Sequence, residues 1–318
     1  MLFRSAAAGR GIRAEEPVLV VLAAGKGTRF GTDPKCIQSV AGKPLARHTI
    51  DAFHGRGAGA CVCIVGYRHE DVVAALGADN LYVLSDNPAG GTALAAYEAF
   101  CIPDLLERNP LLILTMGDRI VPPETLRRLL DAHAAPPREA DLTLLTARYI
   151  PPANRGKGRI VRDDHGRVAA ILEERDIEAL PDPARRAALL SLAEGNCPLY
   201  AIRAAALHDR LRALTNRNAQ GQFYLTDIVA ALQARAADIR TLTTSPGDPE
   251  YDLLCADVTR PADLARLEAA LAKACLPRPL PCDDLAALAA ALAADRPPVQ
   301  SVAIGRQDRR AVGREGGG

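Results

Sequence analysis

The chain has 318 residues, enough to bury a sizeable core, and fits one domain of about 250 residues with extensions. Its 39 basic and 38 acidic residues give a formal net charge of +1, which argues against nucleic acid as the main partner, although local cationic clusters still suit phosphate. No apolar run approaches the ~20 residues that a membrane-spanning helix needs, so no membrane partner is expected.

In the first half of the chain, apolar runs at 18–22, 61–65, 81–84 and 111–116 predict buried strands. They alternate with helical patterns at 45–53, 70–76, 92–100 and 123–133. This alternation predicts an α/β fold of nucleotide-binding, Rossmann-like type, with a mostly parallel sheet covered on both faces. Ligands are expected at the carboxyl ends of its strands.

The middle of the chain is more strand-like. Runs at 142–147, 158–161 and 168–173 are separated by turn residues and predict an antiparallel excursion that covers the pocket. A helix and loop at 181–195, a strand at 197–202 and helices at 225–235 and 261–274 follow. Prolines at 277, 279 and 281 then break the pattern. We expect a flexible N-terminus over 1–16, a domain over 17–276 and a weakly docked or disordered tail over 277–318.

The eight cysteines are scattered and form no C-x-x-C pair, which argues against a zinc site and favours a reducing cytoplasm. The six histidines are spread along the chain, and none forms an i, i+4 pair. We therefore expect no histidine-based mechanism.

The most informative stretch is 18–35, where a strand runs into a Gly-rich turn with three cations, Lys26, Arg29 and Lys35. Free backbone N–H groups and cations of this kind suit a triphosphate, whereas the bare pattern also fits an ordinary turn with solvated cations. The P-loop pattern fails because Val20 stands where it needs a glycine. The dinucleotide fingerprint fails because Phe30 stands at its last glycine.

Several motifs extend this stretch. They are the loop Leu22-Ala-Ala-Gly-Lys-Gly-Thr-Arg29, the pair Pro34-Lys35, the segment Ala41-Gly-Lys-Pro44 and the segment 216–227 (NRNAQGQFYLTD). In these four motifs, the chain resembles the sugar-nucleotide pyrophosphorylase family of nucleotidyltransferases. Within that family, the likeness is to the N-terminal uridylyltransferase domain of bacterial bifunctional N-acetylglucosamine-1-phosphate enzymes. It covers residues 18–274 and implies a GT-A-like fold. No β-helix repeat of the acetyltransferase type follows.

The resemblance implies a role for each matching residue. Arg29 and Lys35 match the catalytic cations, and Asp118, at the end of an apolar run, matches the Mg²⁺ ligand. Thr259 falls at the second metal position, with Asp257 two residues upstream as the alternative. The nucleotide is expected on Leu22, Ala23, Ala24, Gly25, Gly27, Ser85, Asn87, Gly90 and Gly91. The sugar is expected on Gly158, Glu173, Asn196, Tyr224 and Thr226.

The implied reaction is Mg²⁺-dependent transfer of a nucleotidyl group from UTP to N-acetylglucosamine 1-phosphate, with release of pyrophosphate. It needs charge neutralisation and in-line positioning but no protein nucleophile. Three departures from the family leave alternatives open: Ser85 replaces a base-reading Gln, Cys197-Pro198 replaces Thr-Gly, and Thr259 replaces Asn or Asp. These alternatives are another base, another phosphorylated acceptor (a phospho-alcohol, another sugar phosphate or a molybdopterin-type cofactor), or an inactive nucleotide-binding regulatory module. The oligomeric state is left open.

Overall fold

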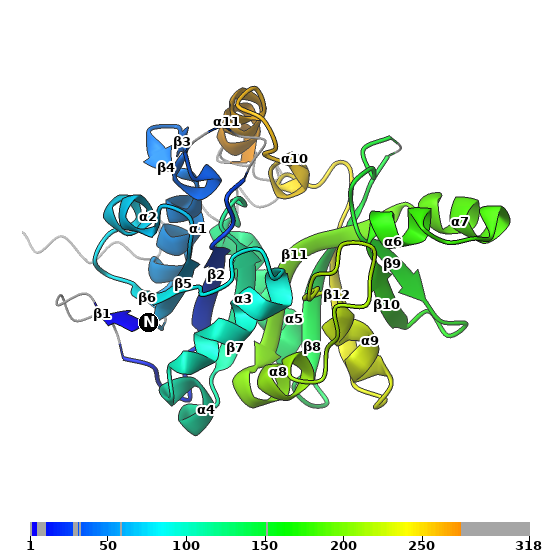
Figure 1. Cartoon of the computed structure of the whole chain (residues 1–318), viewed down its shortest axis with the longest axis horizontal. Helices are drawn as coiled ribbons and strands as arrows, with labels where there is room; N and C mark the ends of the chain where they lie inside the picture. Colours follow the sequence, from blue (N-terminus) through cyan, green and yellow to red (C-terminus); the bar gives the residue numbers. More distant parts are fainter. Residues whose placement is uncertain are drawn as a thin grey trace, which may run out of the picture. The chain divides into compact units, whose positions relative to one another are not determined.

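The centre of the molecule is a mixed sheet of ten strands, seen in a computed structural model that describes residues 2–4, 11–27, 31, 33–57, 59–150 and 152–274 (Figure 1). All of these residues belong to the unit Met1–Cys275. The main path of the sheet runs in the order β1-β6-β5-β2-β7-β11-β8-β12. Its strands are β1 (Leu2–Arg4), β2 (Val18–Ala23), β5 (Cys61–Val65), β6 (Leu81–Leu84), β7 (Leu111–Met116), β8 (Leu142–Arg148), β11 (Glu194–Arg203) and β12 (Ile239–Thr244).

The neighbouring strands β6, β5, β2 and β7 are parallel to one another. Beyond them, β11 is antiparallel to both β7 and β8, while β12 is parallel to β8. The strands β9 (Arg159–Arg162) and β10 (Val168–Leu172) form an antiparallel pair attached to β11. A small second sheet pairs β3 (Ser39–Val40) with β4 (Lys43–Pro44). The expected α/β class, with a mostly parallel core and an antiparallel excursion, is confirmed.

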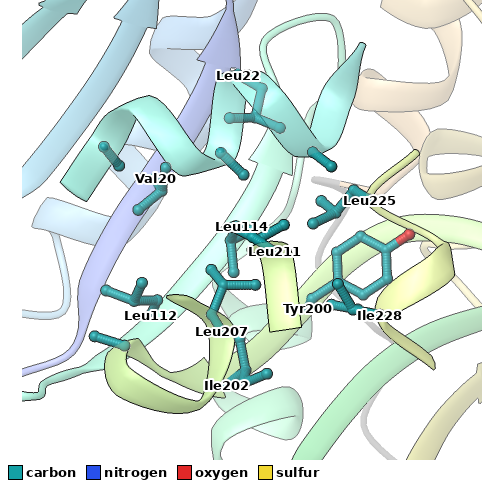
Figure 2. Packing of buried hydrophobic residues seen from close by; sticks show 14 of the residues in the cluster. Val20, Leu22, Leu112, Leu114, Tyr200, Ile202, Leu207, Leu211, Leu225 and Ile228 are labelled. Carbon is teal, nitrogen blue, oxygen red and sulfur yellow. The ribbon is translucent and has the colours of Figure 1, made fainter. Parts of the chain in front are cut away.

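Helices cover both faces of the sheet, because alternate residues of each strand point to opposite sides. In β2, Val18, Val20 and Leu22 pack on the face covered by α3 (Thr92–Glu98), α4 (Asp104–Arg108), α8 (Ala204–Leu211) and α9 (Asp227–Gln233). Figure 2 shows part of this cluster, with Leu207 and Leu211 of α8 beside Leu112 and Leu114 of β7. The odd-numbered residues of β2 pack on the face covered by α1 (Leu45–His54), α2 (His69–Leu76), α5 (Pro123–Ala134) and α10 (Tyr251–Cys255).

The remaining helices lie around the edges of these layers. The helix α11 (Asp263–Ala274) packs its buried Leu267 and Ala270 against Val40 and Leu45. The short elements are α6 (Glu174–Glu178), α7 (Pro183–Leu190), and the 3₁₀ turns Lys35–Ile37 and Ala99–Cys101. The expected helix at 92–100 therefore ends earlier as an α-helix and continues as a 3₁₀ turn.

The sequence predicts segments outside the domain at both ends of the chain, residues 1–16 and 277–318. Residues 2–4, within the expected N-terminal segment 1–16, form β1 and pair with β6. The expected tail over 277–318 lies outside the described residues. Among the described residues, no helix is long and apolar enough to cross a bilayer.

Candidate active site

The carboxyl ends of the four parallel strands β5, β2, β6 and β7 meet at one edge of the sheet, and the loops that leave them bond to one another. The amide of Gly117, after β7, donates to the carbonyl of Leu22 at 2.9 Å. The amide of Ser85, after β6, donates to the carbonyl of Val65 at 2.7 Å. These bonds bring the predicted nucleotide loop and the predicted metal Asp together, as expected for a ligand site in an α/β fold.

A cavity of ≈ 410 Å³ opens at this edge. Ten of the predicted site residues line it: Leu22, Ala23, Ala24, Gly25, Gly27, Lys35, Gly91, Asp118, Glu173 and Tyr224. The cavity therefore brings the expected nucleotide loop, one expected cation, the expected metal ligand and two expected sugar contacts to one place. Cys36, Pro88, Thr92, Ala95, Met116, Gly117, Gln220 and Gln222 complete the lining.

Two oppositely charged side chains of this cavity contact each other. Lys35 Nζ donates to Asp118 Oδ2, and the two side chains are 20% and 31% exposed. Lys35 begins the 3₁₀ turn that follows the nucleotide loop, and Asp118 follows β7. Because both side chains remain partly exposed, a phosphate that enters the cavity can bond to Lys35, and a cation can bond to Asp118. Arg29, the other predicted catalytic cation, lies outside the described residues.

The predicted sugar residues cluster around Glu173. Thr226 Oγ1 donates to Glu173 Oε1 at 2.9 Å, and the amide of Asn196 donates to the carbonyl of Gly158 at 2.8 Å. A Cβ added at Gly158 would lie 2.8 Å from Ile171 Cγ2 and 3.3 Å from Glu173 Oε1, so a side chain there would displace Ile171 and crowd Glu173. Burial raises the pKa of Glu173, and the bond from Thr226 offsets part of that rise.

Only part of this cluster faces the cavity. Glu173 and Tyr224 line it, whereas Gly158, Asn196 and Thr226 do not, and of these three only Thr226 bonds to Glu173. The side-chain carbonyl of Asn196 accepts from Tyr200 Oη at 2.9 Å. Asn196 is thus placed beside the site but is already bonded within the protein.

A second cavity of ≈ 720 Å³ shares Gly27, Lys35 and Pro88 with the first. It is lined by two of the predicted base-reading residues, Ser85 and Asn87, and by Lys26 and Thr259 among others. The Ser85 hydroxyl is buried and has no hydrogen-bond partner among the described residues. A buried polar atom without a partner is costly, so a ligand group that bonded to it would be favoured.

Gly90, the remaining residue expected to hold the nucleotide, lines neither cavity. Its carbonyl accepts from the amide of Phe223 at 2.9 Å, and the carbonyl of Phe223 accepts from the amide of Ala93 at 2.9 Å. The loop before α3 is therefore tied to the segment 216–227.

The two candidates for the second metal position are both engaged. Thr259 Oγ1 donates to Asp263 Oδ2 at 3.0 Å, and the amide of Thr259 donates to the same oxygen at 2.9 Å. Asp257 Oδ1 accepts from Lys157 Nζ, and from Arg119 Nη2 at 2.8 Å. No group of three His, Cys, Asp or Glu side chains able to hold a metal occurs among the described residues.

The donor set nevertheless fits Mg²⁺, which is commonly held by one or two carboxylates together with substrate phosphates and water. Asp118 supplies a carboxylate in the cavity, beside the loop expected to hold phosphates.

Four side chains in or beside this region are not among the predicted site residues. Gln220 and Gln222 line the first cavity and belong to the segment 216–227, so their place in that motif was a usable signal. Arg119 and Lys157 meet at Asp257 behind the site. A buried lysine between two glycines gives no pattern that distinguishes it from a solvated turn residue.

Comparison with known proteins identifies the family. The model of the MobA-like NTP transferase domain matches residues 19–224. The chain belongs to this family. It is 37% identical over 228 residues to the bifunctional protein GlmU of Halorhodospira halophila, covering 71% of this chain and 44% of that protein. It is 36% identical over 251 residues to GlmU of Burkholderia thailandensis, covering 79% and 51% of the two chains.

Two solved structures share the fold. The inositol-1-phosphate CTP transferase of T. maritima aligns with a TM-score of 0.57 at 15% identity, over 83% of this chain and 98% of that one. A glucose-1-phosphate thymidylyltransferase of Bacillus anthracis, described as putative, aligns with a TM-score of 0.58 at 16% identity, over 83% and 97%. The chain spans about half the length of the GlmU proteins that it matches. The GT-A-like nucleotidyltransferase fold implied by the sequence resemblance is confirmed.

Proposed function

We propose that this protein transfers a nucleotidyl group from a nucleoside triphosphate to a sugar 1-phosphate and releases pyrophosphate, with UTP and N-acetylglucosamine 1-phosphate as its substrates. The observation that carries the proposal is the single cavity that joins the loop 22–27, Lys35, Asp118 and Glu173. The GlmU relatives support the nucleotidyltransferase assignment, and the choice of UTP and N-acetylglucosamine 1-phosphate rests on the sequence resemblance.

In this proposal, the residues of the cavity bind, orient and neutralise. The backbone of the loop 22–27 holds the nucleotide, since free amides and glycines permit close approach to phosphate. Lys35 exchanges Asp118 for the α-phosphate and stabilises the charge that develops there. Glu173, fixed by Thr226, accepts hydrogen bonds from sugar hydroxyls. Arg29 completes the phosphate contacts.

Asp118 would hold Mg²⁺, which supplies charge neutralisation on the phosphate oxygens. Asp118 lies in the turn that follows β7, and the bond from the amide of Gly117 to the carbonyl of Leu22 ties this turn to the nucleotide loop. The phosphoryl chemistry then requires no nucleophile from the protein, because the acceptor's own phosphate oxygen attacks the α-phosphorus.

The choice of base is the open part of the proposal. The two solved neighbours are named as a CTP transferase and a putative thymidylyltransferase, and Ser85 stands where the family has a Gln. The hydroxyl of Ser85 and the amide of Asn87, both lining the second cavity, are the polar groups that we assign to base reading.

The test is pyrophosphate release from UTP, CTP, dTTP, ATP and GTP, each with Mg²⁺ and a set of phosphorylated acceptors that includes N-acetylglucosamine 1-phosphate. The proposal predicts the highest kcat/KM for UTP with that acceptor. Inactivity with UTP but turnover with another base would retain the transferase and remove the uridylyl assignment. Nucleotide binding without release from any pair would support an inactive regulatory module instead.

A further inference from the structure

Three charged side chains meet behind the candidate site, outside the residues that line either cavity. Asp257 Oδ1 accepts from both Arg119 and Lys157. The Lys157 side chain is 5% exposed and the Arg119 side chain is 13% exposed, whereas Asp257 is 43% exposed, so two largely buried cations share one oxygen of a partly exposed carboxylate. We call Arg119, Lys157 and Asp257 the charge clamp.

Each member of the charge clamp adjoins a residue of the candidate site. Arg119 follows Asp118, Lys157 precedes Gly158, and Asp257 lies two residues before Thr259. The three come from the loop after β7, the turn before β9 and the segment after α10, which are far apart in the sequence. The charge clamp therefore ties the metal side of the site to its sugar side.

Backbone contacts strengthen the tie. Arg119 Nη1 donates to the carbonyls of Leu254 and Ala256 at 3.1 and 2.9 Å. Lys157 Nζ donates to the carbonyl of Cys255 at 3.5 Å and lies 5.1 Å from the centre of the Tyr149 ring. All three carbonyls precede Asp257, so the cations fix its backbone as well as its carboxylate.

Removing the carboxylate of the charge clamp and removing one of its cations should have different effects on stability. Burial opposes ionisation of Asp257, but Arg119 and Lys157 outweigh it and hold its pKa below the usual range. Loss of Asp257 would leave two buried cations facing each other, whereas loss of Lys157 would leave the Asp257–Arg119 pair intact. A substitution that leaves a buried charge without its partner destabilises a protein more than one that leaves the remaining charges paired, so loss of Asp257 should lower stability more than loss of Lys157.

We propose that Asp257 is a positioning residue which, through Arg119 and Lys157, holds Gly158 and the sugar cluster at the correct place relative to Asp118, and that it is not a metal ligand. The inference rests on the proposed function. It answers the question left open for Asp257: its Oδ1 is bonded to both cations and the residue lines neither cavity, so the metal is left to Asp118, which lines the first cavity.

The first experiment uses calorimetry to measure the affinity for UTP and for UDP-N-acetylglucosamine. Only the second ligand carries a sugar that reaches the cluster around Glu173. Lys157→Met is expected to weaken the nucleotide sugar about tenfold and UTP less than about threefold, because only the sugar side loses its anchor. Lys157→Arg, which keeps a cation, should restore most of the loss. Unchanged affinities in Lys157→Met, or equal loss of both ligands, would overturn the positioning role.

The second experiment needs no substrate. Asp257→Asn should lower the Tm by about 5 °C or more, and adding Lys157→Met to it should recover part of that loss by removing a stranded cation. Asp252→Asn, on the exposed pair with Lys273, is the matched control and should change the Tm little. Failure of the double variant to recover would overturn the clamp.

Binding of Mn²⁺, followed by electron paramagnetic resonance, separates a clamp from a metal ligand. The charge clamp predicts that the Asp257→Asn/Lys157→Met variant binds Mn²⁺ like the wild type. A large loss in that variant would show that Asp257 is itself a ligand. If the wild type neither bound UTP nor released pyrophosphate, the proposed function would fail, while the Tm comparison would still decide whether the clamp exists.

Discussion

At the scale of single residues, the contact between Lys35 and Asp118 is the centre of the account, because one is assigned to the α-phosphate and the other to the metal. Lys35→Ala should lower kcat for pyrophosphate release by about 10²-fold or more but weaken UTP binding far less, since the charge that it stabilises develops in the transition state. Steady-state kinetics and calorimetry give the two numbers.

Lys273→Ala is the control for that variant, because Lys273 also pairs with an aspartate but lies on the surface. Its kinetics should match the wild type. If Lys35→Ala lost UTP affinity in proportion to kcat, Lys35 would be a uniform binding residue and the assignment would be wrong.

Asp227, the first residue of α9, gives a prediction about pH. Burial, with a smaller contribution from Asp176, raises its pKa to about 6. A carboxyl with a folded-state pKa above its unfolded value binds protons more tightly when folded, so its contribution favours folding at low pH and is lost as the pH rises through about 6. Because asparagine does not ionise, Asp227→Asn removes this pH-dependent loss of stability.

The Tm of Asp227→Asn relative to the wild type should therefore be higher at pH 7.5 than at pH 4.5. Thermal unfolding at the two pH values measures this double difference, in which any pH-independent effect of the substitution cancels. A difference of the opposite sign would show that the folded environment favours the ionised carboxylate.

At the scale of elements, the link between the loop before α3 and the segment 216–227 joins the base side to the sugar side. Gly91 has φ +105°, and an added Cβ would lie 2.4 Å from the carbonyl oxygen of Phe223. Gly247 has φ +101° with open space around it. Gly91→Ala should cost at least about 2 kcal/mol more in unfolding free energy than Gly247→Ala, because it adds a backbone clash to the same strain.

Chemical denaturation of both variants tests this prediction. Gly91→Ala should also raise the KM for both substrates, as the loop carries the nucleotide side and Phe223 precedes Tyr224. Equal destabilisation of the two variants would mean that the loop and the segment 216–227 separate at little cost.

The elements that could be predicted from the sequence are those whose patterns are decided locally. The apolar runs at 61–65, 81–84 and 111–116 coincide with β5, β6 and β7 because strands buried on both faces read as continuous apolar runs. The strand β12 was missed because it is half-buried and four of its six residues are polar, three Thr and one Arg. The helix α10 has five residues, too few to show a helical period.

The residues of the candidate site also fall into those that a local pattern predicts and those that only the fold brings together. Residues in contiguous motifs, such as the loop 22–27 and Lys35, were predicted and line one cavity. The charge clamp was not, because its three members are separated by 38 residues or more and meet only through the fold. The second cavity likewise exists only where the loops after β2, β5 and β6 pack together.

At the scale of the whole molecule, the fold gathers four strand ends on one edge of the sheet and places the antiparallel excursion beside them. The nucleotide loop and Asp118 come from the parallel half, and the sugar cluster comes from β10, β11 and the segment before α9. If the proposed roles hold, the two halves of the sheet divide the work, with the nucleotide on the parallel half and the acceptor on the antiparallel half.

The most direct measurement of the central claim follows the α-phosphorus. UTP labelled at that atom is incubated with N-acetylglucosamine 1-phosphate, Mg²⁺ and either the wild-type protein or Asp118→Asn. The account predicts that the wild type moves the label into the nucleotide sugar with one unlabelled pyrophosphate released per transfer, and that Asp118→Asn does so at least about 10²-fold more slowly. Label that stays in UTP with the wild type, or transfer by Asp118→Asn at the wild-type rate, would contradict it.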